Sequence, residues 1–312
     1  MAYVAHDRVL SEPILREFAA QTGIKVRAVY DIEANKTVGL TNRLIAEAAA
    51  PRADVFWNNE VIQTIRLQSR GVAALEPLSD VPVVAPPIAD ARLRWVGFAA
   101  RARVLLLNTA VADRAAVPAP AAPGLWDLAS LHWRGRVAVA NPRFGTTGTH
   151  FAVLLALWGE AEFRRWLKSL RDNGVSVVPG NAQVRDDVVS GRCAAGLTDT
   201  DDAVEAISSG APVRIVFPDQ SKDGTLLIPN TVAMVAHAPH ARAATRLAAY
   251  LLSRDVESAL ARGRSAQIPI NHPVPAPEYF PPRHSLRTMK VDFRAGAAKF
   301  EQMLALVEQE WP

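Results

Sequence analysis

The stretch YVAHDRVLSEPILREFAAQTGIKVRAVY, residues 3–30, indicates how strands and helices are arranged in this chain. It begins and ends with a short apolar run, and each run predicts a β-strand. Between the two runs, Leu10, Ile14 and Phe18 recur at helical spacing, and Gly23 supplies a stop for the helix that they predict. A strand, a helix and a strand in this order are typical of α/β layering.

The same alternation continues to the end of the sequence. The predicted strands are residues 3–5, 25–30, 54–57, 103–108, 135–140, 175–178, 194–198, 215–218 and 230–236. The predicted helices are residues 11–22, 37–50, 149–157, 160–172, 183–190, 201–208, 240–252, 255–261 and 295–310. This pattern predicts an α/β fold and argues against a β-sandwich or a helix bundle.

The composition is that of a globular protein. Because 49% of the 312 residues are hydrophobic, the chain can bury a sizeable core, and its length predicts two lobes. The net charge is only +4, and the arginines are dispersed among acidic residues, so we expect no nucleic-acid partner. The single Cys193 excludes an internal disulfide and a multi-cysteine metal site.

Residues 196–203, Gly-Leu-Thr-Asp-Thr-Asp-Asp-Ala, place three carboxylates directly after a short apolar run. The carboxylates belong to Asp199, Asp201 and Asp202. Like charges this close repel one another, so something must neutralise them or hold them apart. The candidates are a metal ion, an ammonium or guanidinium group from a ligand or a neighbouring arginine, and bulk water.

Polar residues also follow two other predicted strands, where helices are about to begin. Thr146-Thr147-Gly148-Thr149 offers hydroxyls and amides that suit a phosphate, sulfate, carbonate or carboxylate group. Asn181 can cap a helix or reach the same anion. Ligands of open α/β sheets bind at the carboxyl ends of strands, so these residues and the acidic loop are candidates for one site. Each of the three loops also has a plainer interpretation, as a helix cap or a solvated acidic first turn.

An enzyme of another class is a further alternative. Asp-x-Asp-Asp at residues 199–202 spells the acid motif of class II terpene cyclases, and Asp-Thr-Asp resembles the motif of haloacid-dehalogenase phosphatases. The cyclases are all-helical, however, and the phosphatases carry their motif after the first strand. A carboxylate-dependent hydrolase therefore lacks the structural context that its motif requires. The seven histidines show no metal-ligand spacing.

Several short pieces, taken in order, resemble the ferric-ion-binding periplasmic proteins, the solute-binding components of iron(III) ABC importers. The pieces similar to the first lobe are Phe18-Ala-Ala-Gln-Thr-Gly-Ile-Lys-Val26, Arg43-Leu-Ile-Ala-Glu47, Ala53-Asp-Val-Phe-Trp57, and Gly71-Val72 before Leu75-Glu-Pro77. The pieces similar to the second lobe are Trp126-Asp-Leu, Trp133-Arg-Gly-Arg-Val137, Gly145-Thr-Thr-Gly148, and Gly191 before Gly196-Leu197. The likeness runs over nearly the whole chain.

The resemblance implies a two-lobed periplasmic-binding-protein fold of type II, in which each lobe is a mixed sheet flanked by helices. The lobes are expected over residues 1–100 with 230–275 and over residues 101–229, and residues 276–312 are expected to form a helical tail that packs back on them. Crossover strands near Arg103–Asn108 and Asn230–Ala236 would join the lobes and carry a hinge.

The resemblance also implies candidate ligands. In the typical ferric binder a histidine, a glutamate and two adjacent tyrosines hold the iron together with an anion. The matching positions here are Asp7 with His6 beside it, Asn59 with Glu60 beside it, and Asp201 with Asp202. The tyrosine pair is absent, and carboxylate, amide and water oxygens suit less demanding cations than ferric iron.

The resulting hypothesis is a protein that binds a small ligand in an interlobe cleft. The expected ligand-binding residues are His6, Asp7, Asn58, Asn59, Glu60, Thr146, Thr147, Gly148, Thr149, Asn181, Asp199, Thr200, Asp201 and Asp202. The expected metal ligands among them are Asp7, Asn59, Asp201 and Asp202. The ligand would be ferric iron or another metal with a synergistic anion, carried as cargo, and we expect no resident cofactor.

A second ligand class fits the same residues. A small zwitterion with a phosphate, phosphonate or carboxylate group would place its amine at Asp199, Asp201 or Asp202. Arg101 and Arg103 offer another possibility, since pairing with one of these carboxylates would make part of the acidic loop structural.

The expected mechanism is capture of the ligand, hinge closure and delivery to the permease of an ABC importer, without covalent chemistry. Residues 1–5 read directly as a strand, with no signal-peptide pattern before them. We expect the protein to be periplasmic, or extracellular and membrane-tethered, with its signal peptide absent from this sequence. We also expect it to be a monomer.

Overall fold

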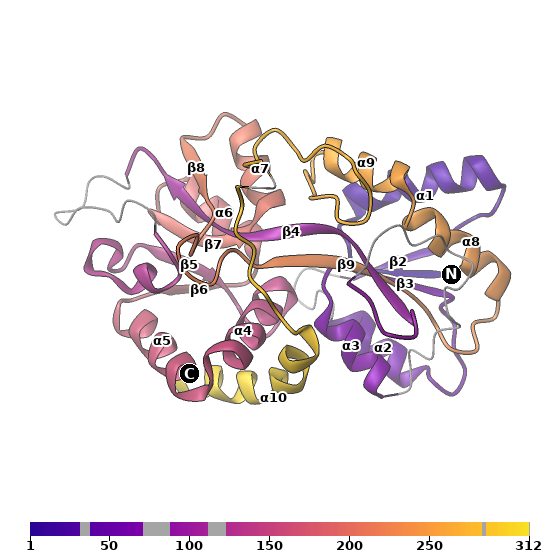
Figure 1. The fold of residues 1–312 in the computed structure, drawn as a ribbon, viewed down its shortest axis with the longest axis horizontal. Coiled ribbons are helices and arrows are strands. Elements are labelled where there is room, and N and C mark those ends of the chain that lie inside the picture. The colour runs from indigo at the N-terminus through magenta and orange to yellow at the C-terminus, as the bar shows by residue number, and fades with distance from the viewer. Residues whose placement is uncertain (32–37, 71–87, 112–122, 283–284, 312) are drawn as a thin grey trace. The chain divides into compact units, whose positions relative to one another are not determined.

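The computed structural model describes residues 1–31, 38–70, 88–111, 123–282 and 285–311, which Figure 1 draws in colour. The chain divides into two compact units. Unit 1 comprises Met1–Ala100 and Ile228–Pro277, and unit 2 comprises Arg101–Leu227 and Glu278–Pro312. Unit 2 thus includes the last segment, which was expected to form a helical tail.

Unit 1 alternates strands and helices from its first residues. Its elements are β1 (Ala2–Val4), α1 (Arg8–Thr22), β2 (Ala28–Tyr30), α2 (Val38–Ala46), β3 (Val55–Asn58), α3 (Ile62–Ser69), the first part of β4 (Trp95–Asn108), most of β9 (Leu227–Met234), α8 (Ala241–Leu251) and α9 (Arg254–Arg262). Strand β1 lies between β2 and β3 and is parallel to both, and β9 pairs antiparallel with β3. The sheet is therefore mixed, as predicted.

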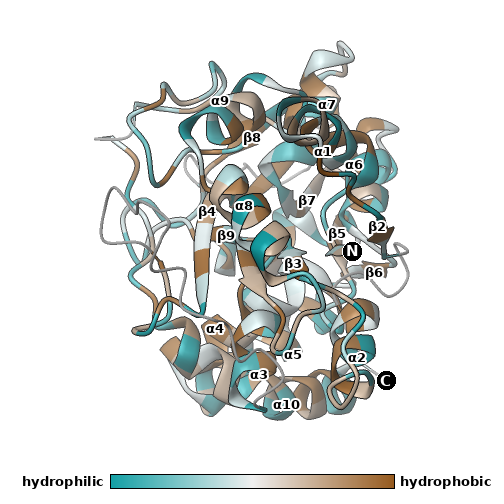
Figure 2. Ribbon diagram, turned by 90° about the vertical axis from the view of Figure 1, so that its right-hand side faces the viewer, coloured by the Kyte–Doolittle hydropathy of each residue, from teal (hydrophilic) through white to brown (hydrophobic). Residues whose placement is uncertain are grey.

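Helix α1 shows why the opening stretch folds as it does. Ile14, Leu15 and Phe18 are buried on one face of the helix. Gly23 follows the helix with a φ angle of 71°, and its N–H donates to the carbonyl of Ala19. Glycine adopts this left-handed conformation without steric cost, so the helix ends there. Figure 2 shows hydrophilic and hydrophobic segments side by side in helices of both units, as expected for helices with one buried face.

Unit 2 contains the remaining part of β4 and the following elements. They are the 3₁₀ helices η3 (Trp126–Ala129) and η4 (Leu131–Trp133), β5 (Val137–Ala140), α4 (Gly145–Trp158), α5 (Glu160–Asp172), β6 (Ser176–Val178), α6 (Asn181–Val189), β7 (Ala195–Asp199), α7 (Thr200–Ser208), β8 (Val213–Val216) and α10 (Phe293–Glu310). Strand β4 pairs antiparallel with β7 and β8. Strand β5 lies between β6 and β7 and is parallel to both, so the carboxyl ends of these three strands meet at one edge.

The core of unit 2 is rich in aromatic side chains. Phe151 of α4 and Phe163 and Trp166 of α5 are fully buried, and the ring centroids of Phe151 and Trp166 lie 5.1 Å apart in an edge-on arrangement. Helix α10 packs against α4 and α5, and Figure 1 shows it in yellow along α4. The ring of Trp311, just after α10, contacts Phe151. This packing fixes α4 in place.

Several elements differ from the expectation, and for β4, α4 and α3 the difference has a clear physical reason. Strand β4 begins at Trp95 instead of residue 103 and is buried throughout. Its first part was not predicted, because Gly97 and Arg101 interrupt the apolar pattern of the sequence. Helix α4 begins at Gly145 instead of residue 149, so two of its threonines lie in the first turn of the helix. Helix α3 was not predicted, because it is short and buries polar residues such as Gln63.

None of the described helices combines the length and the apolar character that a membrane-spanning helix needs. Two pieces of the family resemblance, Gly71-Val72 and Leu75-Glu-Pro77, lie outside the described residues.

Candidate functional site

Three helices of unit 2 begin at the common edge of β5, β6 and β7. Helices α4, α6 and α7 start directly after these strands, and their N-cap residues are Phe144, Gly180 and Asp199. None of these three residues caps its own helix with a side-chain hydrogen bond. The first N–H groups of a helix carry partial positive charge, so this edge of the sheet attracts negative groups.

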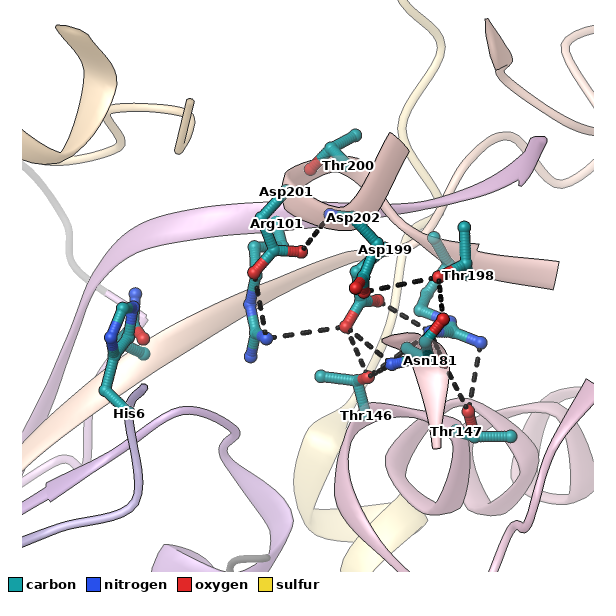
Figure 3. Close-up of polar contacts among 12 residues, drawn as sticks. His6, Arg101, Thr146, Thr147, Asn181, Thr198, Asp199, Thr200, Asp201 and Asp202 are labelled. Atoms are coloured by element: carbon teal, nitrogen blue, oxygen red, sulfur yellow. Dashed lines mark hydrogen bonds and ion pairs between the residues drawn. The ribbon is translucent and has the colours of Figure 1, made fainter. Parts of the chain in front are cut away.

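The carboxylate of Asp199 lies at this edge and is 1% exposed. Its Oδ1 accepts a hydrogen bond from Nη1 of Arg103 over 2.6 Å. Its Oδ2 accepts from the hydroxyl of Thr146 over 2.5 Å and from Nδ2 of Asn181 over 3.0 Å. Figure 3 shows Thr146, Asn181 and Arg101 gathered around Asp199. Both carboxylate oxygens are therefore engaged by groups of the chain itself.

Arg103 reaches Asp199 because the two residues are direct cross-strand partners in the β4–β7 pair. The Arg103 side chain is fully buried. Beyond the ion pair it donates from Nη2 to the Thr147 hydroxyl over 3.1 Å and from Nη1 to Oδ1 of Asn181 over 3.3 Å. One guanidinium thus joins β4 to the first turns of α4 and α6.

The hydrogen bonds of Thr147 and Asn181 close the cluster. The Thr147 hydroxyl accepts from Arg103 and donates to Oδ1 of Asn181 over 3.3 Å. Nδ2 of Asn181 also lies 2.9 Å from the Thr146 hydroxyl oxygen, to which it donates. Thr146, Thr147 and Asn181 were expected to contact a bound anion, and in this structure they lie around the carboxylate of Asp199 and its partner Arg103.

The charged neighbours of Asp199 and His150 shift the pKa values of both side chains. Burial alone raises the pKa of Asp199, but the Arg103 and Arg101 guanidiniums and the Thr146 hydroxyl outweigh burial and hold that pKa below its ordinary value. His150 of α4 is fully buried, with Nδ1 3.5 Å from Nε of Arg103. Burial and the neighbouring Arg103 charge lower the pKa of His150 well below its ordinary value, so the imidazole stays neutral.

The other two carboxylates lie in the first turn of α7 and are partly exposed. Nη1 of Arg101 lies 3.4 Å from Oδ2 of Asp199 and 3.6 Å from Oδ2 of Asp201. Asp202 accepts from the Thr198 hydroxyl over 3.3 Å and lies 3.8 Å from Nη1 of Arg185. Each of the three carboxylates therefore has a guanidinium partner.

The three carboxylates could also approach a metal ion together. One oxygen each from Asp199, Asp201 and Asp202 can be chosen so that all three lie within 4.8 Å of one another. Carboxylate oxygens are ligands of hard cations. A cation at this position would compete with Arg101, which lies close to two of the three.

The other candidate residues of unit 2 have structural contacts. The Thr200 hydroxyl accepts from the backbone N–H of Ala102 over 3.1 Å, which ties α7 to β4. A Cβ on Gly148 would lie 2.7 Å from the carbonyl oxygen of Pro142 and 3.3 Å from the Phe300 ring, so close packing explains this glycine. Thr149 is buried at the start of the second turn of α4.

The candidates of unit 1 form a separate group, in which Glu60 organises helix α3. Its carboxylate accepts from the backbone N–H groups of Ile62 over 2.6 Å and Gln63 over 2.8 Å, and from Nδ2 of Asn58 over 3.0 Å. Glu60 and Asn58 are fully buried, and the neighbouring Asn59 is 3% exposed. The Glu60 carboxylate thus serves as a helix cap.

His6 and Asp7 connect β1 to α1. Gln267 donates from Nε2 to Nε2 of His6 over 2.6 Å, so His6 is the tautomer with its proton on Nδ1. The His6 ring lies against Trp57, with ring centroids 5.1 Å apart. The carbonyl of Asp7 accepts the first backbone hydrogen bonds of α1, whereas its side chain does not cap the helix.

Sequence reasoning missed Arg185, His150 and Gln267. Their roles depend on contacts between residues that are distant in the sequence, such as Gln267 and His6, which are 261 positions apart. The cap formed by Glu60 had a local signal, since an acidic residue precedes Ile62 by two positions, but helix α3 itself was not predicted.

The chain is similar to known proteins over most of its length. A sequence model of the family described as bacterial extracellular solute-binding protein matches residues 14–282. A Fe(3+)-binding periplasmic protein of Serratia marcescens is 30% identical over 197 residues, which cover 62% of this chain and about half, 55%, of that protein. Iron uptake protein A1 of Synechocystis is 26% identical over 277 residues, covering 83% of this chain and 73% of that protein.

Solved structures extend the likeness to the fold. Iron-bound HitA from Pseudomonas aeruginosa superposes with a TM-score of 0.84 at 25% identity, covering 100% of this chain and 98% of that one. AfuA from Actinobacillus pleuropneumoniae, solved with fructose-6-phosphate bound, gives a TM-score of 0.86 at 16% identity, covering 99% and 97% of the two chains. These comparisons confirm the resemblance to ferric-ion-binding periplasmic proteins and the type II fold.

Proposed function

The chain belongs to the bacterial extracellular solute-binding protein family, and we propose that it captures a small zwitterion for an ABC importer. The zwitterion would carry an amine and a phosphate, phosphonate or carboxylate group. One observation carries this proposal: each of Asp199, Asp201 and Asp202 has a guanidinium partner within 3.8 Å.

The charge balance of the site argues for a solute of low net charge. A ferric ion would bring three positive charges beside Arg101, which already lies 3.4 Å and 3.6 Å from two of the carboxylates. Like charges in a partly buried site repel strongly, so the ion would have to displace the guanidinium. A zwitterion adds one charge of each sign and leaves the existing pairs in place.

The amine of the solute would bind at Asp201 and Asp202. Their side chains are 12% and 16% exposed, whereas Asp199 is buried. Arg185 lies 3.8 Å from Asp202 but only 2.5 Å from Glu205 and 2.9 Å from Asp186. An ammonium group at hydrogen-bond distance would therefore interact with Asp202 more closely than Arg185 does.

The acidic group of the solute would bind at the starts of α4, α6 and α7. The N-cap residues of these helices make no side-chain hydrogen bond to the first backbone N–H groups, and in α7 the N–H of Asp202 donates to Oδ1 of Asp201 over 3.1 Å. Such groups bind phosphate and carboxylate oxygens, and Arg101 adds a positive charge beside them.

Ferric iron or another metal with a synergistic anion is the second candidate solute. It is supported by the oxygens of Asp199, Asp201 and Asp202, which can lie within 4.8 Å of one another, and by the iron-binding relatives. Asp7 and Asn59 would complete its ligands. The sequence has no tyrosine pair after β7, so phenolate ligands would be missing.

We further propose that the family's general mechanism applies. The protein would act as a monomer in the periplasm or tethered outside the cell, close about a hinge at β4 and β9, and deliver its solute to a membrane permease. Both strands cross the boundary between the two units of the chain, which supports this hinge position. No covalent chemistry is proposed.

Thermal unfolding of chelator-treated protein would test the proposal. Amino-phosphonates, amino acids and phosphorylated amines should raise the melting temperature without metal, because a ligand of the folded state stabilises it. The Asp201→Asn/Asp202→Asn double variant should lose this shift. The Asp186→Asn variant should keep it, because Asp186 is an exposed partner of Arg185. Stabilisation by ferric salts with carbonate or phosphate, and by no zwitterion, would favour the metal.

A further inference from the structure

The Asp199 carboxylate is held by a set of donors that matches a receptor for a small oxyanion. These donors are Arg103, Thr146, Asn181 and Arg101, and we call them the anion cradle. They place two guanidiniums, a hydroxyl and a side-chain amide within 3.4 Å of the carboxylate oxygens. Figure 3 shows three of these donors converging on the Asp199 carboxylate.

The anion cradle has features that an isolated ion pair does not need. Arg103 is fully buried and makes further bonds to Thr147 and Asn181, which fix its direction. The donors come from β4, α4 and α6, whose positions are set by the sheet and the helices. A rigid, largely buried group of donors with two positive charges can bind phosphate and sulfate as well as carboxylate.

We propose that Asp199 is a built-in anion that excludes inorganic phosphate and sulfate from the side-chain donors of the cradle. The backbone N–H groups proposed above for the solute are not part of the cradle. The chain supplies its own oxyanion, so these ions find the donors occupied. The proposal does not depend on which solute the protein carries, because the cradle lies entirely within unit 2 and is complete without a solute.

Removing the carboxylate should turn the cradle into a site for free anions. The Asp199→Ala variant leaves Arg103 buried without a carboxylate to balance its charge and vacates the space of that carboxylate. Inorganic phosphate should then enter and stabilise the variant. We expect 10 mM phosphate to raise the melting temperature of Asp199→Ala by about 5 °C more than chloride of equal ionic strength does.

Two controls separate occupation of the cradle from a general salt effect. The wild-type protein should show no comparable phosphate-specific rise. Asp199→Asn should show none either, because its amide keeps the volume of the carboxylate and fills the same space. If phosphate raised the melting temperature of Asp199→Asn as much as that of Asp199→Ala, the proposal would be overturned. Loss of the Asp199 charge alone would then explain the effect of phosphate.

The result remains decisive if Asp199→Ala does not fold in chloride. Refolding from urea with inorganic phosphate or sulfate should then recover folded protein, and refolding with chloride should not. Failure of every oxyanion to recover the variant would contradict the proposal. The Arg103→Met/Asp199→Ala double variant lacks the central donor and should show no recovery that depends on phosphate. Solute binding by the wild-type protein is measured separately, so failure of the zwitterion proposal leaves this test unaffected.

Discussion

Arg103 and Asp199 are 96 positions apart in the sequence, yet they pair across β4 and β7 through a 2.6 Å bond with both side chains buried. Burying either charge without the other costs far more than burying the pair. This relationship makes the acidic loop partly a structural feature of unit 2.

The Arg103→Met variant should lose about 3–5 kcal/mol of unfolding free energy, because it leaves the Asp199 charge uncompensated. Urea denaturation would measure the loss. Arg143→Met is a matched control, since Arg143 pairs with Glu308 at an exposed position, and its cost should stay below about 1 kcal/mol. Equal costs for the two variants would show that the buried pair has no special role.

Gly148→Ala should destabilise the protein by about 1–3 kcal/mol, because the new methyl group overlaps the carbonyl oxygen of Pro142. In an open helix position the same change stabilises a protein by up to about 1 kcal/mol, so the sign of the effect is informative. Chemical denaturation measures it. A stabilised variant would mean that α4 does not pack this closely.

Asp90 should contribute to acid stability. Burial raises its pKa, but the bonds from Arg94, Gln68 and the Arg92 backbone outweigh burial and lower the pKa from 3.8 to about 2. The stabilisation is therefore complete above about pH 4 and is lost as the pH falls through about 2. We expect a contribution on the order of 1 kcal/mol, since Arg94 is partly exposed to water.

Unfolding curves between pH 2 and pH 5 would test this contribution. The Asp90→Asn variant should show a smaller loss of stability over this range than the wild-type protein. A loss of the same size in both proteins would assign the acid sensitivity to other carboxylates.

His6 should carry its proton on Nδ1, because Nε2 accepts from Gln267 over 2.6 Å. Long-range proton–nitrogen NMR spectra report the tautomer directly. Gln267→Glu should shift the proton to Nε2, since a carboxylate can only accept there. A wild-type His6 protonated on Nε2 would refute the assigned hydrogen bond, and a metal held through Nε2 would require Gln267 to move away.

Much of the fold could be predicted from the sequence because its signals are local. The spacing of Leu10, Ile14 and Phe18 indicated α1, and similar patterns indicated α5 and α10 within two residues of their ends. The signal failed where burial overrode the pattern. Helix α3 buries Gln63 and Thr64, and β4 buries Arg101 and Arg103, so neither element looks apolar along its whole length.

The residues of the candidate site could be predicted from the sequence, but the ion pairs between its arginines and carboxylates could not. Polar residues at strand ends indicated that Thr146, Asn181 and Asp199 would meet, because parallel strands end at one edge of a sheet. The sequence left open whether Arg101 and Arg103 pair with the carboxylates. That question depends on the register of β4 against β7, which no local pattern encodes.

The mutual hydrogen bonds of Thr146, Thr147, Asn181 and Arg103 have a consequence for the affinity of solute capture. These side chains already hold one geometry through their bonds to one another and to Asp199. Ordering a side chain on binding costs about 0.5–1.5 kcal/mol, and here folding has ordered them before any solute arrives. Unit 2 therefore holds the starts of α4 and α6 in a fixed geometry, and a solute that binds beside these side chains loses little affinity to the entropy of the protein.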